Sequence, residues 1–236
     1  MNKSSPALIF LFIPFIISCS TPTRPQTTLT LGQQTRIFPS LNSVKALRDQ
    51  AVVKQKTDYS CGASALATLL SYGLGDSVTE AQILQQLLTV LPHDQKQLRE
   101  KQGFSLLDLQ MVAKQRGYKA MGFYLRPENL VKLHSPVIVF IKPHGYNHFA
   151  VLKGVRHDRV YLADPALGNI RMPAYQFLTI WQNEKGKGII FVVEKNKGVA
   201  NNQLRLPSSD LVQPELLGTR QLLETGIPSL TITPFR

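Results

Sequence analysis

The chain has 236 residues, of which 43% are hydrophobic and 18% charged, and this composition excludes a chain that is disordered throughout. Its 27 Lys and Arg residues outnumber its 15 Asp and Glu residues, which gives a formal net charge of +12. The basic residues are scattered, and no aromatic residues alternate with them in the manner of an RNA-binding surface. We therefore predict one folded domain with tails, a solvated basic surface and no nucleic-acid partner.

The first 18 residues have the pattern of a signal peptide. Lys3 supplies positive charge, and the apolar run from Ala7 to Ile17 is too short to cross the ~30 Å hydrocarbon core of a membrane. The run ends in IISC, which resembles a bacterial lipobox and implies cleavage before Cys19 and lipid attachment to its sulfur. The alternative is an ordinary secretory signal with a chance cysteine. We expect a periplasmic protein anchored to the membrane through lipid, and Ser20 favours the outer membrane.

The remainder of the chain divides by composition into three predicted parts. A tether rich in Ser, Thr, Pro and Gln occupies residues 19–45 and a domain occupies residues 46–195. After residue 195 the periodic patterns fade, so residues 196–236 are predicted to be an extended or partly disordered C-terminal tail.

The first half of the predicted domain is helical apart from a short strand expected at 51–55. A buried helix is expected from Cys61 to about Leu70, where small and apolar residues dominate. Capping-box patterns open the next two predicted helices, at Thr79 and at Ser105, and these helices extend to about Val90 and to Gly117.

The second half of the domain changes to the pattern of strands. Strands are predicted at 120–125, 136–141, 148–155, 159–163 and 188–193, and short helices at 127–133 and 173–181. Helices followed by an antiparallel sheet make an α+β fold.

Two residues at element starts are candidates for nucleophilic catalysis. Cys61 lies where a helix begins, and the positive end of a helix stabilises a thiolate. His148 follows a polar turn and opens an apolar strand, where a base would be held rigidly. Each has a structural alternative: a buried cysteine in a helix of small residues, and a strand-end histidine satisfied by the backbone.

Two further residues could complete such a site. Asp164 ends the strand after that of His148, so a hairpin between these strands would bring the carboxylate to the imidazole. The alternative for Asp164 is a structural role in its Asp-Pro turn. Gln55 lies six residues before Cys61, and its amide could donate a hydrogen bond to an oxyanion beside the Cys61 N–H.

Taken together, three segments resemble the C39 peptidase family of papain-like domains, known for cutting leader peptides after a double glycine. They are QKTDYSCGASALA from residue 55, NHFAV from residue 147 and ADP from residue 163, within about residues 50–195. The resemblance implies a papain-like α+β fold without a cofactor. It makes Cys61 the nucleophile, His148 the general base, Asp164 the residue that orients it and Gln55 the oxyanion donor. Ser60 departs from the pattern, since many members have Asp there.

The implied partner is a polypeptide substrate, such as a glycine-rich leader or a secreted subunit, because stand-alone envelope members of this family accompany secreted fibre or amyloid systems. One alternative is a non-catalytic protein that binds a peptide during secretion. A second is a cysteine hydrolase of peptidoglycan peptides, which is disfavoured because Gly62 follows the cysteine and Asp164 is the third member. No metal is expected, since the histidines and cysteines lack the spacing of known metal sites.

Overall fold

The structure is a computed structural model that describes residues 29–31, 35–37, 43–195 and 203–206. The chain divides into two units, residues 1–42 and 43–236. In the first unit, strands β1 (Leu29–Leu31) and β2 (Thr35–Ile37) form an antiparallel pair. The predicted signal peptide and Cys19 lie outside the described residues, as does most of the predicted tail. Among the described residues, no helix has the length and apolar character needed to cross a membrane.

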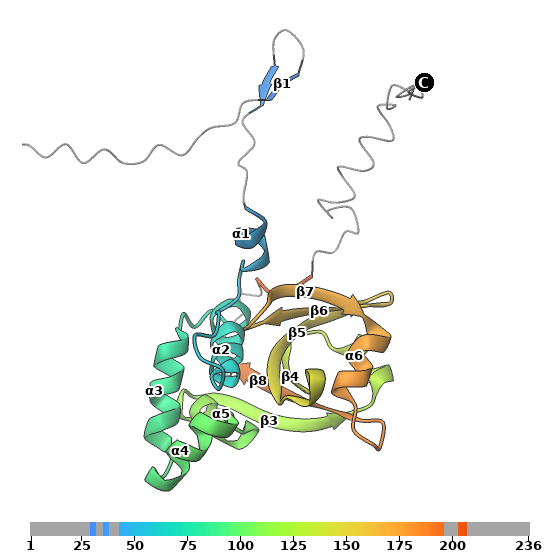
Figure 1. The fold of residues 1–236 in the computed structure, drawn as a ribbon. Coiled ribbons are helices and arrows are strands. Elements are labelled where there is room, and N and C mark those ends of the chain that lie inside the picture. The colour runs from blue at the N-terminus through green and yellow to red at the C-terminus, as the bar shows by residue number, and fades with distance from the viewer. Residues whose placement is uncertain (1–28, 32–34, 38–42, 196–202, 207–236) are drawn as a thin grey trace, which may run out of the picture. The chain divides into compact units, whose positions relative to one another are not determined.

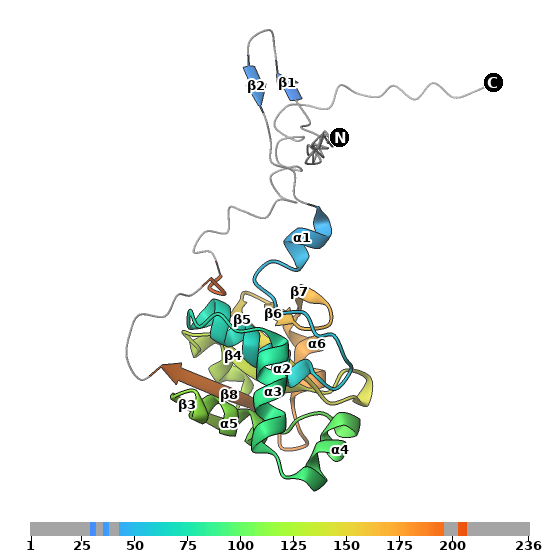
Figure 2. The ribbon, with the colours of Figure 1, turned by 90° about the vertical axis from the view of Figure 1, so that its left-hand side faces the viewer.

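The second unit begins with helices and continues as a sheet, as predicted (Figure 1). Its helices are α1 (Val44–Arg48), α2 (Cys61–Thr68), α3 (Glu80–Val90), α4 (His93–Gln102), α5 (Leu106–Gln115) and α6 (Ala174–Trp181), with a π-helical turn η1 (Leu69–Gly73) and 3₁₀ turns η2 (Pro127–Lys132) and η3 (Pro143–Gly145). Figure 2 shows α3 and α4 facing the viewer with the strands behind them. The α+β prediction is therefore confirmed.

Six antiparallel strands form the sheet in the order β3-β8-β4-β5-β6-β7. They are β3 (Tyr118–Leu125), β4 (Val137–Ile141), β5 (His148–Arg156), β6 (Arg159–Asp164), β7 (Gly168–Pro173) and β8 (Gly188–Lys195). The predicted hairpin of β5 and β6 is present, with Val151 opposite Ala163. Strand β7 was not predicted, because its residues GNIRMP begin with Gly and end with Pro and so lack a strand pattern.

The predicted helix starts agree with the observed caps. The Thr79 hydroxyl accepts a hydrogen bond from the Gln82 N–H at 3.3 Å, and the Ser105 hydroxyl accepts one from the Asp108 N–H at 3.2 Å. Both caps are full capping boxes. Helix α4 was missed because its sequence HDQKQLREKQ is almost entirely polar and buries no residue.

The strand predicted at 51–55 is wrong. This segment forms single hydrogen bonds and no strand pairing. The Val53 N–H donates to Thr68 Oγ1 at 2.9 Å, and the Gln55 N–H donates to the Pro165 carbonyl at 3.0 Å. The segment therefore joins the start of the helical half to the turn that follows β6.

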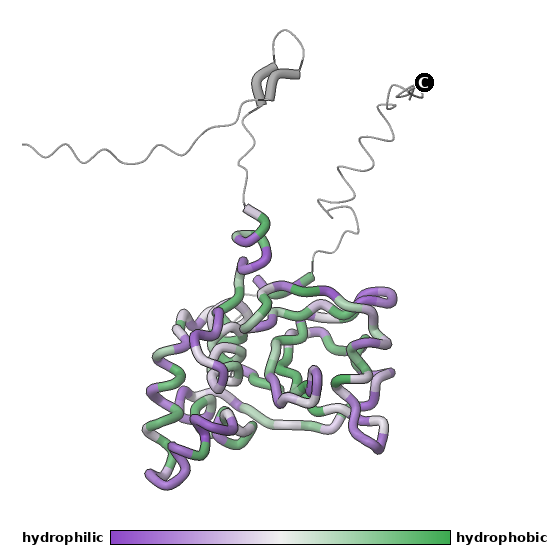
Figure 3. The backbone as a smooth tube through the Cα atoms, in the orientation of Figure 1, coloured by the Kyte–Doolittle hydropathy of each residue, from purple (hydrophilic) through white to green (hydrophobic). Residues whose placement is uncertain are grey.

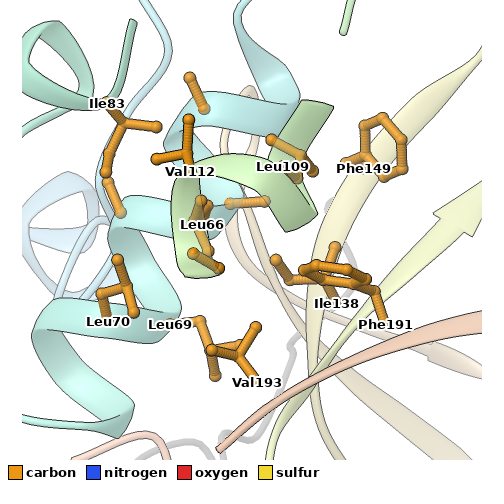
Figure 4. Close-up of a cluster of buried hydrophobic side chains, with 14 of the residues drawn as sticks. Leu66, Leu69, Leu70, Ile83, Leu109, Val112, Ile138, Phe149, Phe191 and Val193 are labelled. Carbon is orange, nitrogen blue, oxygen red and sulfur yellow. The ribbon is translucent and has the colours of Figure 1, made fainter. Parts of the chain in front are cut away.

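Two hydrophobic clusters cover opposite faces of the sheet. The first packs α2, α3 and α5 against one face, where Leu66 and Leu109 lie near Ile138, Phe149 and Phe191 (Figure 4). All eight residues of α2 are buried. Figure 3 shows this contrast in hydropathy, with α4 mostly hydrophilic and α2 and the central strands more hydrophobic.

The second cluster lies under α6, on the other face of the sheet. Phe177 stacks on Trp181 with ring centroids 5.5 Å apart, and the Trp181 indole N–H donates to the Ile189 carbonyl at 3.0 Å. This cluster packs α6 against one face of the sheet. The first cluster packs the helical half against the opposite face and so positions it.

One short segment of the predicted tail packs on the domain. The Gln203 N–H donates to the Tyr72 carbonyl at 2.8 Å, and Leu204 is fully buried in the first cluster. A leucine flanked by polar residues gives no periodic signal, so the sequence did not indicate this contact.

Candidate active site

Cys61 is the first residue of α2 and is a free, buried thiol. Its N-terminal position on the helix leaves the first backbone N–H groups of α2 without helical partners, and Cys61 itself lines the cleft. Gly62 lets this helix approach β5, because a Cβ atom there would lie 3.2 Å from Phe149 Cδ2. The small residues of α2 therefore set the depth at which the thiol lies.

His148 is the first residue of β5 and pairs with Ile141 of β4. Its Nε2 lies 3.0 Å from Asp164 Oδ2, which leaves Nδ1 for the thiol of Cys61. Burial alone lowers the pKa of the imidazole. The hydrogen bonds to Asp164 and Cys61 and their negative charge outweigh burial and raise the pKa of His148 to about 9. The ring is therefore an imidazolium at neutral pH.

Asp164 is the last residue of β6 and is 3% exposed. While Oδ2 contacts His148, Oδ1 accepts hydrogen bonds from the Ala166 N–H at 2.7 Å and the Leu167 N–H at 2.9 Å. Burial raises the pKa of this carboxyl, but the bonds to His148 and to the turn lower it below its usual value. Asp164 thus serves its turn and orients the imidazole at the same time, so the two interpretations of the sequence are compatible.

Gln55 lies in the same cleft as the other three residues, and the cleft has a volume of about 820 Å³. The Gln55 amide donates one hydrogen bond to the Thr57 carbonyl at 3.1 Å. An amide NH₂ group carries two donor hydrogens, so one remains for a ligand. The structure brings together all four residues predicted in the domain.

A second recess of about 310 Å³ adjoins Cys61 and was not predicted. Its apolar lining comes from the α4–α5 connection and from the sheet: Phe104, Leu106, Phe140, Phe149 and Ile189. The segments lie far apart in the sequence, and only the packing of the two halves brings them together. The recess could hold an apolar side chain beside the thiol.

Within the described residues, no cluster of three or more His, Cys, Asp or Glu side chains could hold a metal ion. A thiol next to an imidazolium, which an ionised carboxylate orients, is the arrangement of nucleophilic acyl transfer.

Comparison with known proteins gives the same class of chemistry. Residues 49–197 match the model described as the Peptidase C39 family. A Pseudomonas fluorescens protein named "Probable functional amyloid protease FapD" is 37% identical over 157 residues, covering 66% of this chain and 66% of the relative. The protein of the same name from Pseudomonas aeruginosa is 34% identical over 192 residues, covering 81% and 79%.

Two solved structures resemble the fold. The first is a double glycine motif protease from an AMS/PCAT transporter in complex with the leader peptide, with a TM-score of 0.50 and 27% identity, covering 61% of this chain and 91% of that one. The second is the peptidase domain of Streptococcus ComA, with a TM-score of 0.50 and 22% identity, covering 61% and 98%. These likenesses confirm the predicted α+β fold of a papain-like peptidase domain.

Proposed function

The chain belongs to the peptidase C39 family and is a cysteine peptidase, and we propose that it cuts a secreted or exported polypeptide at or near a Gly-Gly site in the bacterial cell envelope. One observation carries the catalytic part of this proposal. Cys61, His148, Asp164 and Gln55 line one cleft, with the imidazole held at 3.0 Å by the carboxylate and within hydrogen-bonding reach of the thiol.

The first step is attack of the Cys61 thiolate on the carbonyl carbon of the scissile peptide bond. The imidazolium of His148, with a pKa raised to about 9, stabilises the thiolate and then gives its Nδ1 proton to the leaving amine. Asp164 holds the Nε2–H, which fixes the ring and the tautomer that forms. Water then attacks the thioester and gives a proton to the neutral His148, and Cys61 leaves as the thiolate. The new carboxylic acid loses its proton to solvent, so the pair of thiolate and imidazolium is restored.

The negative charge on the carbonyl oxygen needs donors that are already in place. The Cys61 N–H, at the start of α2, and the second Gln55 amide hydrogen are the donors of this cleft. Both are fixed by the short segment that connects them.

The shape of the cleft supports a polypeptide substrate with small residues at the cut. Cys61 is only 6% exposed, so the scissile backbone must come close to the thiol, and glycine residues at the cut allow the closest approach. Two exposed side chains that line the cleft, Tyr146 and Leu167, offer apolar contacts for a bound chain. The similarity to a double glycine motif protease at 27% identity supports Gly-Gly as the site.

The envelope location rests on the N-terminal sequence. The signal pattern of residues 1–18 and the lipobox support lipid attachment at Cys19, and Ser20 favours the outer membrane. The relatives named as probable functional amyloid proteases support a secreted amyloid subunit as the substrate. Metabolic labelling with palmitate tests the anchor: label and membrane association that persist in Cys19→Ala would contradict it.

Incubation of the purified protein with peptides of about twenty residues that contain one Gly-Gly pair tests the peptidase activity. Mass spectrometry should find a cut after the second glycine, and no cut when that pair is Ala-Ala. Cys61→Ala should fold normally and cut nothing. Cleavage that persists in this variant would exclude Cys61 as the nucleophile, and a wild-type protein that binds these peptides without cutting any would leave only a binding role.

A further inference from the structure

A buried carboxylate that the catalytic steps do not use lies behind the nucleophile loop, residues 55–61. Glu80 is the first residue of α3 and is 3% exposed. Its Oε1 atom accepts a hydrogen bond from the Lys56 N–H at 2.8 Å and another from the Ser60 hydroxyl at 2.5 Å. Lys56 follows Gln55 directly and Ser60 precedes Cys61 directly, so one oxygen atom binds both ends of the loop.

Glu80 is not needed to cap its own helix. The capping box of α3 is already complete between Thr79 and Gln82, on the side chains and backbone of those two residues. The carboxylate is instead directed at the loop. A buried carboxylate is costly unless donors surround it, and here two short hydrogen bonds and the positive end of α3 compensate the charge.

Ser60, like Glu80, does not cap its own helix. Serine at the N-cap of a helix normally accepts a hydrogen bond from the first turn, but Ser60 makes no such cap bond to α2. Its hydroxyl donates to Glu80 and accepts from the Thr57 N–H at 3.3 Å. The side chains of Glu80 and Ser60 both lie at helix starts, and both form hydrogen bonds within the nucleophile loop or to it in place of capping their helices.

The bonds continue to the oxyanion donor. The Thr57 carbonyl accepts from the Gln55 amide at 3.1 Å and from the Ser60 N–H at 3.3 Å. Glu80, Ser60, Thr57 and the Gln55 amide thus form one connected chain of hydrogen bonds. No regular secondary structure holds residues 52–60, so this chain fixes the Gln55 amide relative to the Cys61 N–H.

We propose that Glu80 is a positioning residue, which acts through Ser60 and the Lys56 N–H to hold the two oxyanion donors at the separation that the transition state needs. The proposal rests on the proposed peptidase function. Because the oxyanion exists only after the thiolate has attacked, loss of Glu80 should lower kcat and leave KM nearly unchanged. Loss of a whole oxyanion donor costs about 10²–10³ in kcat, so a misplaced donor should cost roughly 10- to 100-fold.

Glu80→Gln and Ser60→Ala test the proposal in the full-length protein. The probe is a fluorogenic peptide with Gly-Gly before an aminocoumarin, and kcat and KM are measured for each variant. In parallel, the rate of Cys61 alkylation by iodoacetamide is followed by mass spectrometry of the Cys61 peptide. Alkylation displaces iodide at a saturated carbon and forms no oxyanion, so it reports on the thiolate and His148 alone.

We expect both variants to lose roughly 10- to 100-fold in kcat, with KM and the alkylation rate within about twofold of wild type. The double variant should lose no more than the larger single loss, because both residues act in one chain of hydrogen bonds. Asp76→Asn is the matched control, since Asp76 is another side-chain acceptor, bound to Arg116 and Tyr118 away from the cleft. It should lower the melting temperature without changing kcat or alkylation.

A wild-type kcat in folded Glu80→Gln and Ser60→Ala would overturn the proposal, and so would alkylation that falls in proportion to kcat. If Glu80→Gln does not fold, Ser60→Ala carries the test, because it removes only a hydroxyl. A wild-type protein that fails to cut the Gly-Gly peptide would contradict the proposed substrate instead. The positioning role would then be read from acylation of Cys61 by p-nitrophenyl acetate, which also forms an oxyanion, with the same expected loss.

Discussion

The two halves of the domain hold their catalytic groups by different means. The sheet half supplies His148 and Asp164 from the ends of paired strands, where the ladder of β5 and β6 fixes the backbone. The helical half supplies Cys61 from a helix start and Gln55 from an irregular segment. Backbone pairing therefore positions the proposed base, whereas side-chain packing positions the proposed nucleophile and a buried carboxylate positions the proposed oxyanion donor.

Removal of the base should give the largest effect on activity. His148→Ala takes away the group that stabilises the thiolate and protonates the leaving amine, so kcat/KM should fall by at least ~10⁴-fold. The strand should persist, because its other residues keep their bonds to β4 and β6. A peptide-cleavage assay with circular dichroism as the control checks this. A loss below tenfold in a folded variant would contradict the assignment of His148.

A change in the packing of α2 should give the next largest effect, because it acts on the helical half alone. In Gly62→Ala the added methyl group would lie 3.2 Å from Phe149 Cδ2, so the Phe149 ring or α2 must move by a few tenths of an ångström. We expect a loss of about 1–3 kcal/mol in the free energy of unfolding, together with a lower kcat. Thermal unfolding and cleavage kinetics measure both.

The matched control for this change is a compensating substitution on the sheet side. Phe149→Leu in the Gly62→Ala background makes room for the methyl group and should recover part of both losses. If the double variant is as impaired as the sum of the single ones, the contact between Gly62 and Phe149 does not set the depth of the thiol.

The same difference between the halves explains what the sequence could predict. The strands and the capped starts of α3 and α5 follow from local patterns, and so does the pairing of β5 with β6 that brings Asp164 to His148. Helix α4 and strand β7 lack such patterns. Contacts between distant segments, such as Glu80 with Ser60, depend on packing and leave no periodic signal in the sequence.

The interaction of His148 with Asp164 in the sheet half should make the free energy of unfolding depend on pH, with an effect on the order of 3 kcal/mol. The pKa of His148 is raised from 6.5 to about 9 in the folded protein. The pairing of the imidazolium with Asp164 therefore adds stability that is fully present below pH 6.5 and is lost as the pH rises through about 9.

Comparison of wild type with Asp164→Asn isolates this contribution. The variant lacks the negative charge, so the pKa of its imidazole should be lower and its stability should depend less on pH in this range. Urea unfolding at pH 6 and at pH 9.5 should give a wild-type advantage that shrinks at the higher pH. An advantage that grows with pH would show that the histidine pKa is not raised.

The smallest effect on activity should come from residues 203–206, the described part of the tail, which packs on the helical half. Leu204 is fully buried, and a Cβ atom at Gly73 would lie 3.6 Å from its Cδ1 atom. Leu204→Ala should cost about 2–5 kcal/mol of unfolding free energy through the cavity that it leaves. Because the backbone of this segment bonds to η1 and Leu204 lies near Gly73, kcat in the folded state should stay within about twofold of wild type. The neighbouring exposed residue Gln203 provides the control: Gln203→Ala keeps its backbone bond to Tyr72 and should change neither quantity. A large drop in kcat for Leu204→Ala at a temperature where it is fully folded would mean that the helical half transmits strain from η1 through α2 to Cys61, and that its positioning extends well beyond Glu80.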